Sequence, residues 1–396
     1  MNKRSVRDLD VRDKRVLVRV DFNVPILDGR VTDDTRIRRA LPTIRYLIER
    51  GAHPILISHL GRPKGEPDPQ YVMDPVAERL EELLGEPVLK LDATVGHEVE
   101  KAVEGWDGRG VVLLENSRFY PGETKNDPEL SEQLAALADL YVDDAFGAAH
   151  RAHSTTVGVA ERLPAAAGLL LEEEVDYLDG VLENPERPFA AILGGAKVSD
   201  KLGVIRSLLG VADTLLVGGA MCFTFFKARG YEIGESLVED DYLEEAHRLM
   251  DEAGEKLMLP VDVVVADRIE KGVEAQTVGV DGIPPDKMGL DIGPGTVKLF
   301  EEHISSAETI FWNGPMGVFE IDAFAKGTEG VARAVARAST ESDATSVIGG
   351  GDSVAAVRKL GLEDEMSHIS TGGGASLEYI EGKQLPGVAA LPEKGA

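Results

Sequence analysis

The segment FAAILGGAKVSDK, from Phe189 to Lys201, places a short apolar run directly before two glycines and two lysines. The apolar run predicts a buried strand, and the glycines let a backbone approach a ligand closely. A helix that starts after such a turn directs free N–H groups and the positive end of its dipole toward that point, which suits a phosphate. Lys197 and Lys201 are spaced to share one face of that helix. The alternative is a solvated helix flank with two ordinary lysines.

Similar apolar runs recur along the chain, and helix-like segments separate most of them. They are RVLVRV (15–20), PILIS (54–58), VVLLE (111–115), LYVDD (140–144), FAAIL (189–193), TLLVGG (214–219), VDVVVA (261–266), TIFWNG (309–314) and SVIGG (346–350). Continuous apolar runs predict strands buried on both faces, and alternation with helices predicts parallel sheets with helical crossovers. The sequence therefore predicts an α/β fold.

With 396 residues, the chain is too long for a single core, so two domains are expected. The best boundary lies around residues 165–188, where the sequence predicts an isolated connector helix that ends in a proline-flanked turn. Strands before this boundary end in charged residues, and strands after it end in glycines. Because ligands of open α/β sheets bind at the carboxyl ends of the strands, we expect a cationic site in the first half and a backbone-rich site in the second.

The composition excludes several classes of protein. The chain has 70 acidic against 42 basic residues and a formal net charge of -28, which argues against nucleic-acid binding. Acidic side chains are spread through helices and lysine is scarce, a pattern that favours a surface adapted to high salt; an ordinary acidic mesophilic enzyme is the alternative. No apolar run reaches the roughly 18 residues of a membrane span, and the N-terminus has no apolar segment typical of a secretion signal. The single cysteine, Cys222, is expected to be a small buried apolar side chain in a reducing cytoplasm rather than a nucleophile.

Charged side chains cluster at the strand ends of the first half. They are Arg19, Asp21 and Asn23 in RVDFNVP, His59 and Arg62 in SHLGRP, Arg118 in LENSRF and Arg151 in DAFGAAHRAHS. A single arginine of this kind is more often a surface ion-pair partner. Five arginines, counting Arg36, would instead form a positive pocket in an acidic protein, and such a pocket needs an anionic ligand.

Arg36 is the most informative of these arginines. We expect Thr32 or Asp33 to cap the helix in TDDTRIRRALPTIRYLIER, which places Arg36 in the first turn. The helix dipole disfavours a cation there, and a phosphate bound between Arg36 and the helix start would resolve the conflict. Neutralisation by Asp33 and Asp34 is the alternative.

In the second half, GGGDS (349–353) places Asp352 beside a glycine turn after an apolar strand. One carboxylate combined with nucleotide phosphates suits Mg²⁺, although Asp352 could also be a helix N-cap. WNGPMGVFE (312–320) offers an apolar wall and a carboxylate for a nucleoside, and STGGGAS (370–376) opens a further helix with glycines. The chain contains no GxxxxGK[ST] loop, no protein-kinase motifs, no zinc spacing and no GxSxG motif.

Taken together, these motifs resemble the phosphoglycerate kinase family over nearly the whole chain and in the family's order. The resemblance implies two Rossmann-like lobes, each a parallel sheet flanked by helices. One lobe is expected at residues 1–165 with the C-terminal tail 380–396, the connector helix at 166–188 and the second lobe at 189–379. It also implies a cytoplasmic monomer, similar to an archaeal, halophile-like member, that binds no nucleic acid or membrane.

The resemblance implies specific roles for individual residues of this sequence. The first lobe is expected to bind 3-phosphoglycerate through Arg19, Asp21, Asn23, Arg36, His59, Arg62, Arg118 and Arg151. The second is expected to bind Mg²⁺ with ATP or ADP through Gly195, Ala196, Lys201, Gly219, Asn313, Pro315, Glu320, Gly349, Gly350, Gly351, Asp352 and Ser353, with Asp352 on the metal. Arg36, Lys197, Gly372 and Gly373 are expected at the transferring phosphoryl group.

The implied reaction is reversible phosphoryl transfer between 1,3-bisphosphoglycerate and ADP. Its acceptor in reverse is a carboxylate that is already ionised, so no catalytic base is needed, and the two lobes must close to bring the substrates in line. Three departures from the family pattern are small-residue exchanges: Ala220 in VGGAM, Ser353 in GGGDS, and HSTTVG (153–158) for the more frequent HSSTVG. Ser353 is expected to keep a hydroxyl for phosphate or metal. A dinucleotide oxidoreductase and a non-catalytic solute-binding protein are the rival functions, but the former lacks its GxGxxG unit here.

Overall fold

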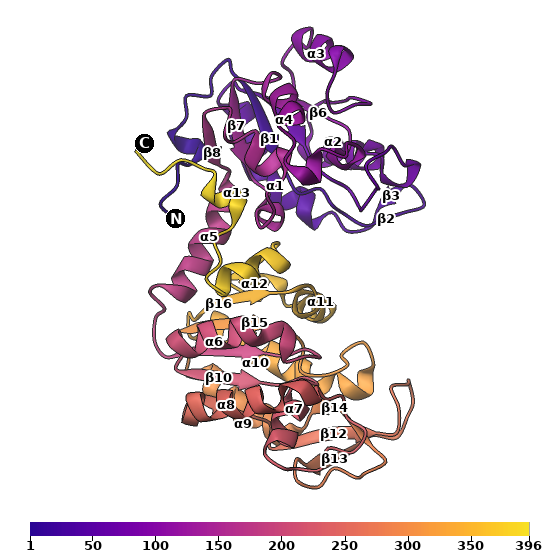
Figure 1. Cartoon of the computed structure of the whole chain (residues 1–396), viewed down its shortest axis with the longest axis vertical. Helices are drawn as coiled ribbons and strands as arrows, with labels where there is room; N and C mark the ends of the chain where they lie inside the picture. Colours follow the sequence, from indigo (N-terminus) through magenta and orange to yellow (C-terminus); the bar gives the residue numbers. More distant parts are fainter. Residues whose placement is uncertain (396) are drawn as a thin grey trace. The chain divides into compact units, whose positions relative to one another are not determined.

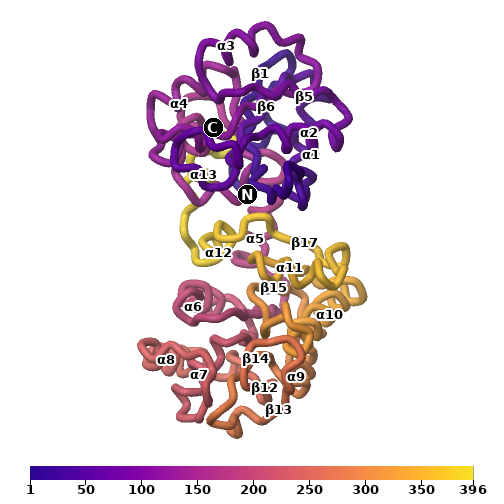
Figure 2. Tube along the Cα trace, turned by 90° about the vertical axis from the view of Figure 1, so that its right-hand side faces the viewer, coloured from indigo at the N-terminus to yellow at the C-terminus, as the bar shows by residue number. Residues whose placement is uncertain are grey.

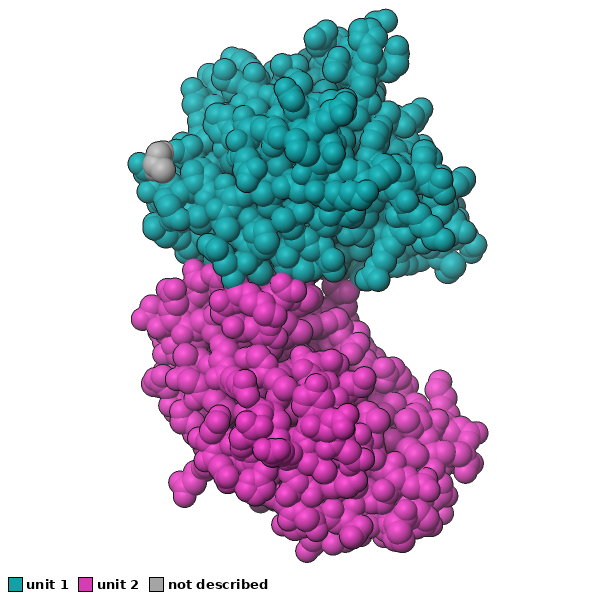
Figure 3. Space-filling model, in the orientation of Figure 1, with its two compact units in different colours: residues 1–176, 384–396 teal, residues 177–383 magenta. Residues whose placement is uncertain are grey.

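The computed structural model describes residues 1–395. Contacts within the chain divide it into two compact units, Met1–Asp176 with Gln384–Ala396, and Tyr177–Lys383. We call them unit 1 and unit 2 (Figure 3). Each unit has its own buried core of aliphatic and aromatic side chains.

Unit 1 is built on a six-stranded parallel sheet with strand order β5-β6-β4-β1-β7-β8. The strands are β1 (Arg15–Arg19), β4 (His53–Ile57), β5 (Val88–Lys90), β6 (Val111–Leu113), β7 (Leu140–Asp143) and β8 (Ala165–Ala167). Helices α1 (Thr35–Glu49), α2 (Asp74–Leu84), α3 (His97–Glu104) and α4 (Pro128–Ala135) connect them, and β2 (Ile26–Leu27) and β3 (Arg30–Val31) form a hairpin. The continuous apolar runs are buried on both faces, as expected for parallel strands.

Unit 2 contains a second six-stranded parallel sheet, with order β11-β10-β9-β15-β16-β17. Its strands are β9 (Phe189–Leu193), β10 (Thr214–Val217), β11 (Leu257–Met258), β15 (Thr309–Asn313), β16 (Thr345–Gly349) and β17 (His368–Ile369). Its helices are α6 (Leu202–Val211), α7 (Cys222–Ala228), α8 (Leu243–Ala253), α9 (Pro294–Ser305), α10 (Lys326–Glu341), α11 (Gly351–Leu360) and α12 (Gly374–Ile380) (Figure 1). Two parallel sheets flanked by helices confirm the predicted fold class.

Single-turn helices complete the two units. They are η1 (Val6–Asp8), η2 (Pro69–Tyr71), η3 (Ser117–Phe119), η4 (Glu123–Lys125), η5 (Phe146–Ala148), η7 (Ser199–Lys201), η8 (Asp240–Tyr242), η9 (Gly254–Lys256), η10 (Asp322–Phe324) and η11 (Glu363–Glu365), with one π-helix, η6 (Ser154–Gly158).

The sequence prediction fails for VDVVVA (261–266). This run forms β12 (Asp262–Ala266), the middle strand of an antiparallel sheet with β13 (Gln276–Gly279) and β14 (Met288–Ile292). Loops rather than crossover helices join the three strands, so they pair antiparallel. The run is also not buried on both faces, because Val264 is half-buried between the buried Val263 and Val265. A continuous apolar run alone did not distinguish this arrangement from a parallel strand.

The expected connector at 166–188 differs from the structure at its start. Ala165–Ala167 form β8 of the first sheet, and only Leu169–Leu182 form the helix, α5. The division between the units falls inside α5. The C-terminal segment returns to unit 1 from Gln384 rather than from residue 380, and α13 (Pro386–Ala389), yellow in Figure 2, lies among unit 1 elements. There the Gly387 N–H donates to the Ala149 carbonyl at 2.8 Å.

Asp144 holds the first turn of α5. Its Oδ1 accepts from the N–H groups of Leu170 at 2.9 Å and Leu171 at 3.4 Å, and burial raises its pKa from 3.8 to about 8. The folded protein therefore binds this proton more tightly than the unfolded chain, so the free energy of unfolding falls as pH rises from about 4 to about 8.

We expect Asp144→Asn to flatten this pH dependence, because asparagine keeps the acceptor oxygen but cannot ionise. Thermal melts between pH 5 and pH 8 measure it, with the exposed Asp10→Asn as a control of equal charge change. Equal slopes for Asp144→Asn and the wild type would show that Asp144 does not titrate in this range.

Candidate functional site

The carboxyl edge of the unit 1 sheet gathers most of the predicted polar residues. Arg19 ends β1, Asp21 and Asn23 follow it, and His59 follows β4. The Gly61 N–H donates to Asn23 Oδ1 at 2.8 Å, which joins the segment after β1 to the one after β4. The prediction that these strand ends meet is therefore confirmed for residues from β1 and β4.

Arg19 is fully buried, with 0 % of its surface exposed. Its Nε donates to Thr155 Oγ1 at 2.9 Å, its Nη1 to the Val20 carbonyl, and its Nη2 contacts His59 Nδ1 at 3.0 Å. The prediction that Arg19 binds substrate directly is therefore wrong. A strand-end arginine was expected to project outward, but three acceptors in the core hold it inside.

Arg36 lies in the first turn of α1, as predicted. Asp34 stands at the N-cap position without a side-chain cap bond, whereas Asp33 Oδ1 accepts from the Thr35 N–H at 2.9 Å. Asp34 pairs with Arg38 at 2.8 Å and with Arg79 at 2.6 Å. The neighbour of Arg36 is instead Asp21, whose Oδ2 lies 3.3 Å from Arg36 Nη1. Asp34 is therefore paired with other arginines, and Asp21 partly balances this helix-start cation.

Three further arginines have few acidic partners. Arg62 and Arg151 are exposed and form no ion pair with any residue between 1 and 395. Arg118 donates to the Gly61 carbonyl at 2.7 Å, while its Nε is buried without a hydrogen-bond partner in the described chain. Burial and the nearby Arg19 lower the pKa of Arg118. Cations that lack counter-charges in a chain of net charge -28 indicate an anion-binding surface.

Three buried residues beneath this surface, Glu123, His153 and Thr155, were not predicted as site residues from the sequence. Glu123 Oε1 accepts from Thr155 Oγ1 at 2.6 Å and lies 3.8 Å from His153 Nδ1. Burial raises the pKa of Glu123, and burial lowers the pKa of His153 to about 4. Glu123 lies in a turn-rich loop, where periodicity gives no sign of burial, so no signal in the sequence pointed to it.

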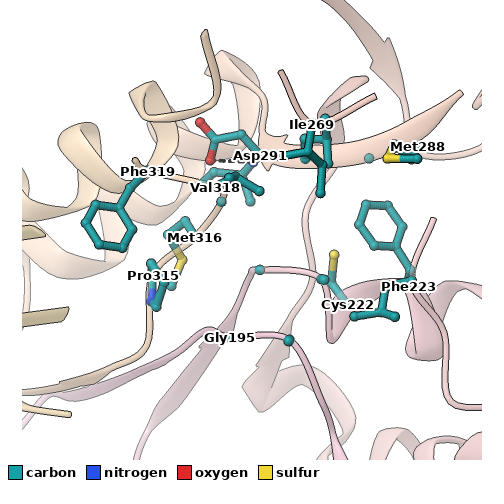
Figure 4. A pocket seen from close by; sticks show the side chains of 18 of the residues that line it. Gly195, Cys222, Phe223, Ile269, Met288, Asp291, Pro315, Met316, Val318 and Phe319 are labelled. Atoms are coloured by element: carbon teal, nitrogen blue, oxygen red, sulfur yellow. Dashed lines mark hydrogen bonds between the residues drawn. The ribbon is translucent and has the colours of Figure 1, made fainter. Parts of the chain in front are cut away.

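A cavity of about 510 Å³ in unit 2 is lined by six of the predicted nucleotide residues. They are Gly195, Ala196, Gly219, Pro315, Glu320 and Asp352. Phe223, Met288 and Phe319 contribute apolar walls, as Figure 4 shows. The remaining predicted residues, Lys201, Asn313, Gly349, Gly350, Gly351 and Ser353, do not line this cavity.

Two glycine-containing loops at the cavity are hydrogen-bonded to the loop after β15. The Gly195 N–H donates to the Pro315 carbonyl and the Gly219 N–H to the Met316 carbonyl, both at 3.1 Å. These two amides are therefore not free for a phosphate, contrary to the expectation for the glycine turn. Close backbone approach explains the glycines instead: a Cβ on Gly219 would lie 2.5 Å from the N and O of Gly195.

Lys197 and Lys201 do not share a helix face, so that prediction is wrong. Lys197 is exposed in the loop before η7, and Lys201 is the last residue of η7, before α6 begins. Lys201 Nζ donates to Asn313 Oδ1, and burial lowers the pKa of Lys201. Asn313 Nδ2 is buried without a hydrogen-bond partner in residues 1–395. Lys197 thus remains exposed, whereas Lys201 links η7 to the end of β15.

The GGGDS segment joins β16 to α11. Ser353 is fully buried and its Oγ accepts from the Gly314 N–H at 2.5 Å, so Ser353 fixes the loop after β15 rather than facing a phosphate or metal. Asp352, in the first turn of α11, is exposed at the cavity and makes no hydrogen bond or ion pair with the described residues. No group of three His, Cys, Asp or Glu side chains positioned for a metal occurs among residues 1–395. A single free carboxylate beside a nucleotide-sized cavity fits Mg²⁺ held mainly by phosphates and water.

The STGGGAS turn precedes α12, which starts at Gly374. Gly373 has a φ of +51° there, and the Gly372 N–H donates to Ser370 Oγ at 3.1 Å. The Gly372 amide is therefore occupied within its own turn.

Two other side chains line the cavity. Asp291 was missed by the sequence analysis: it is buried and accepts from the N–H groups of Gly327 at 2.7 Å and Ile292 at 2.9 Å. Burial raises its pKa to about 7. Cys222 is buried as predicted, and burial raises the pKa of its thiol.

Every helix within residues 1–395 is too short or too polar to span a lipid bilayer.

Comparison with known proteins identifies close relatives over the whole chain. The family model described as phosphoglycerate kinase matches residues 6–383. Phosphoglycerate kinase of Rubrobacter xylanophilus is 76% identical, covering 100% of this chain and 99% of its own length. The structure of phosphoglycerate kinase from Coxiella burnetii matches with a TM-score of 0.88 and 42% identity, and that from Pyrococcus horikoshii with 0.84 and 34%; each covers 98% of both chains. The more similar sequence relatives are bacterial, which does not support the expected likeness to an archaeal, halophile-like member.

Proposed function

Because the chain belongs to the phosphoglycerate kinase family and catalyses that family's reaction, we propose that its two units divide the two substrates between them. The reaction is reversible phosphoryl transfer between 1,3-bisphosphoglycerate and ADP, giving 3-phosphoglycerate and ATP in glycolysis. One chain carries both candidate sites, so we also propose that it works as a monomer. The single cysteine, Cys222, supports our proposal of a reducing cytoplasm.

We assign 3-phosphoglycerate to the cationic surface of unit 1. The observation that carries this assignment is the set of arginines without acidic partners in an acidic chain. Arg62, Arg118 and Arg151 supply positive charge, and His59 and Asn23 supply neutral polar groups. A phosphorylated carboxylate matches this combination, because it carries charge at both ends.

We assign the nucleotide with Mg²⁺ to the cavity of unit 2. Its volume of about 510 Å³ and its apolar walls fit a nucleoside. Asp352 would hold the metal, which supplies charge neutralisation for the phosphate oxygens when bound. Glu320 lines the cavity as an exposed carboxylate and suits the ribose hydroxyls.

Catalysis then consists of positioning and charge neutralisation. The acceptor carboxylate needs no base, and the cations Lys197 and Arg36 neutralise the oxygens of the phosphoryl group during transfer.

Calorimetric titration tests the division of the two substrates between the units. Arg62→Ala should weaken 3-phosphoglycerate binding and leave nucleotide binding unchanged, and Glu320→Ala should do the reverse. If each variant weakens both ligands equally, the two-site assignment fails.

We predict that the units close on each other when both substrates are bound. In-line transfer requires reacting atoms about 3 Å apart, and the two sites belong to different units. Small-angle scattering should give a smaller radius of gyration with both substrates bound than with neither. An unchanged radius at saturation would exclude closure.

We also predict that the protein is more stable at high salt. At a net charge of -28, surface carboxylates repel one another over a Debye length of about 30 Å at 0.01 M salt, against about 3 Å at 1 M. Thermal melts in a KCl series should therefore show a rising Tm up to molar salt. A flat or falling Tm would remove the proposed salt adaptation without affecting the enzymatic assignment.

A further inference from the structure

The contact between Arg19 and His59 fixes which imidazole nitrogen carries the proton. An arginine guanidinium is always protonated and has no acceptor atom. Arg19 Nη2, 3.0 Å from His59 Nδ1, must therefore donate to that nitrogen. Nδ1 then holds a lone pair, and the proton of the neutral ring is on Nε2.

His59 also stays neutral near physiological pH. Burial and the positive charge of Arg19 hold its pKa well below 6.5. The charged and titratable groups around it are Arg19, Arg36, Arg118 and His153, with Asp21 Oδ1 at 4.0 Å from Nδ1. That separation is too long for a hydrogen bond, so Asp21 does not compete with Arg19 for Nδ1. Nε2 makes no hydrogen bond to any residue in the described part of the chain.

Arg19 is itself held from behind. Its Nε donates a hydrogen bond to Thr155 Oγ1 at 2.9 Å. The Thr155 hydroxyl in turn donates to Glu123 Oε1 at 2.6 Å. Glu123 is fully buried, and its second oxygen accepts from the Thr155 N–H at 3.1 Å. A continuous buried chain thus runs from Glu123 through Thr155 and Arg19 to His59.

We propose that Glu123 and Thr155 are positioning residues that hold Arg19 in place, so that His59 presents a fixed Nε2–H donor to an anionic oxygen of 3-phosphoglycerate. This inference rests on the proposed assignment of 3-phosphoglycerate to unit 1. A neutral donor with a fixed proton binds the anion without taking up a proton, so its contribution to binding does not depend on pH near neutrality.

Thr155→Val tests the chain, because valine keeps the shape of threonine and removes the hydroxyl. Without the Thr155 acceptor, Arg19 loses one of its three anchors and His59 is no longer constrained. We expect KM for 3-phosphoglycerate to rise about 10-fold, with kcat and KM for Mg-ATP unchanged. Thr155→Ser should restore the wild-type value. Thr94→Val is the matched control, since Thr94 is equally buried in unit 1 and its hydroxyl donates to the Glu115 carbonyl at 2.9 Å.

Long-range ¹H–¹⁵N spectra of the ligand-free enzyme report the His59 tautomer directly. The wild type and Thr94→Val should show a proton on Nε2 throughout the neutral pH range, whereas Thr155→Val should show a second tautomer or an upward shift of the His59 titration. Glu123→Gln should act in the same direction as Thr155→Val, which gives a second variant if valine at 155 prevents folding.

Three results would overturn the proposal: a wild-type proton on Nδ1, a His59 titration at or above its ordinary value of 6.5, or wild-type spectra and KM for Thr155→Val. If the spectra are as expected but the wild-type enzyme does not bind 3-phosphoglycerate in unit 1, the ligand assignment fails and the tautomer assignment stands.

Discussion

Replacing Lys197 or Arg36 by alanine is expected to lower kcat about 10²- to 10³-fold while changing KM much less. Both cations are assigned to the phosphoryl group in flight, and an interaction made mainly in the transition state affects kcat rather than KM. Lys197 is exposed in the loop before η7, and Arg36 stands in the first turn of α1. Steady-state kinetics at saturating Mg-ATP measures both values.

Arg62→Ala and Arg118→Ala are the matched controls for these variants. Both residues belong to the cationic surface assigned to 3-phosphoglycerate, and we propose that they hold its non-reacting phosphate, so their loss should mainly raise KM for that substrate. Near wild-type kcat for Arg36→Ala would mean that its position at the helix start only balances Asp21, 3.3 Å away. The role in the transition state would then belong to Lys197.

Gly219→Ala is expected to destabilise unit 2 by about 2–5 kcal/mol and to raise KM for ATP. Gly219 has a φ of +69°, a left-handed conformation that strains alanine. The added Cβ would also lie 2.5 Å from the N and O of Gly195, and backbone atoms cannot move aside as a side chain can. The interlocked loops that line the nucleotide cavity would have to separate.

Gly210→Ala is the control for this substitution. Gly210 lies in α6 of the same unit, and nothing within 4 Å would meet its Cβ. Because glycine weakens a helix, we expect this variant to be more stable by about 0.5–1 kcal/mol. Thermal melts compare the two variants. A wild-type Tm for Gly219→Ala would refute the packing argument.

The sequence was sufficient to predict the α/β class, the four central strands of each parallel sheet and most of the cluster at the carboxyl edge of unit 1, whereas the short edge strands β5, β8, β11 and β17 were not predicted. Burial on both faces leaves continuous apolar runs, and helical crossovers leave recognisable segments between them. The position of Arg36 at the start of a helix was also predicted. Its place in the first turn of α1 was predicted from local capping signals, with an error of one or two residues in the cap itself.

The sequence alone did not predict the partners of individual side chains. Lys201 donates to Asn313, 112 positions along the chain, and Arg19 donates to Thr155, 136 positions away. Local patterns carry no information about such pairs, because the topology of the sheet decides which loops meet. For this reason the exposed role of Arg19 and the phosphate contact of Ser353 were predicted wrongly. The shared helix face of Lys197 and Lys201 failed for a local reason, because α6 begins only at Leu202.

Local chemistry therefore determined the elements of this protein and the kinds of side chain at their ends. Turn glycines, apolar runs and helix starts depend on interactions between residues that are close in the sequence, so they can be recognised from the sequence alone. Only the tertiary structure decided which of these side chains face a ligand, which are buried at the cavity wall like Asp291, and which lie beneath the site like Glu123. Burial and hydrogen bonding of a polar group depend on what packs over it, and in both units the covering residues come from distant parts of the chain.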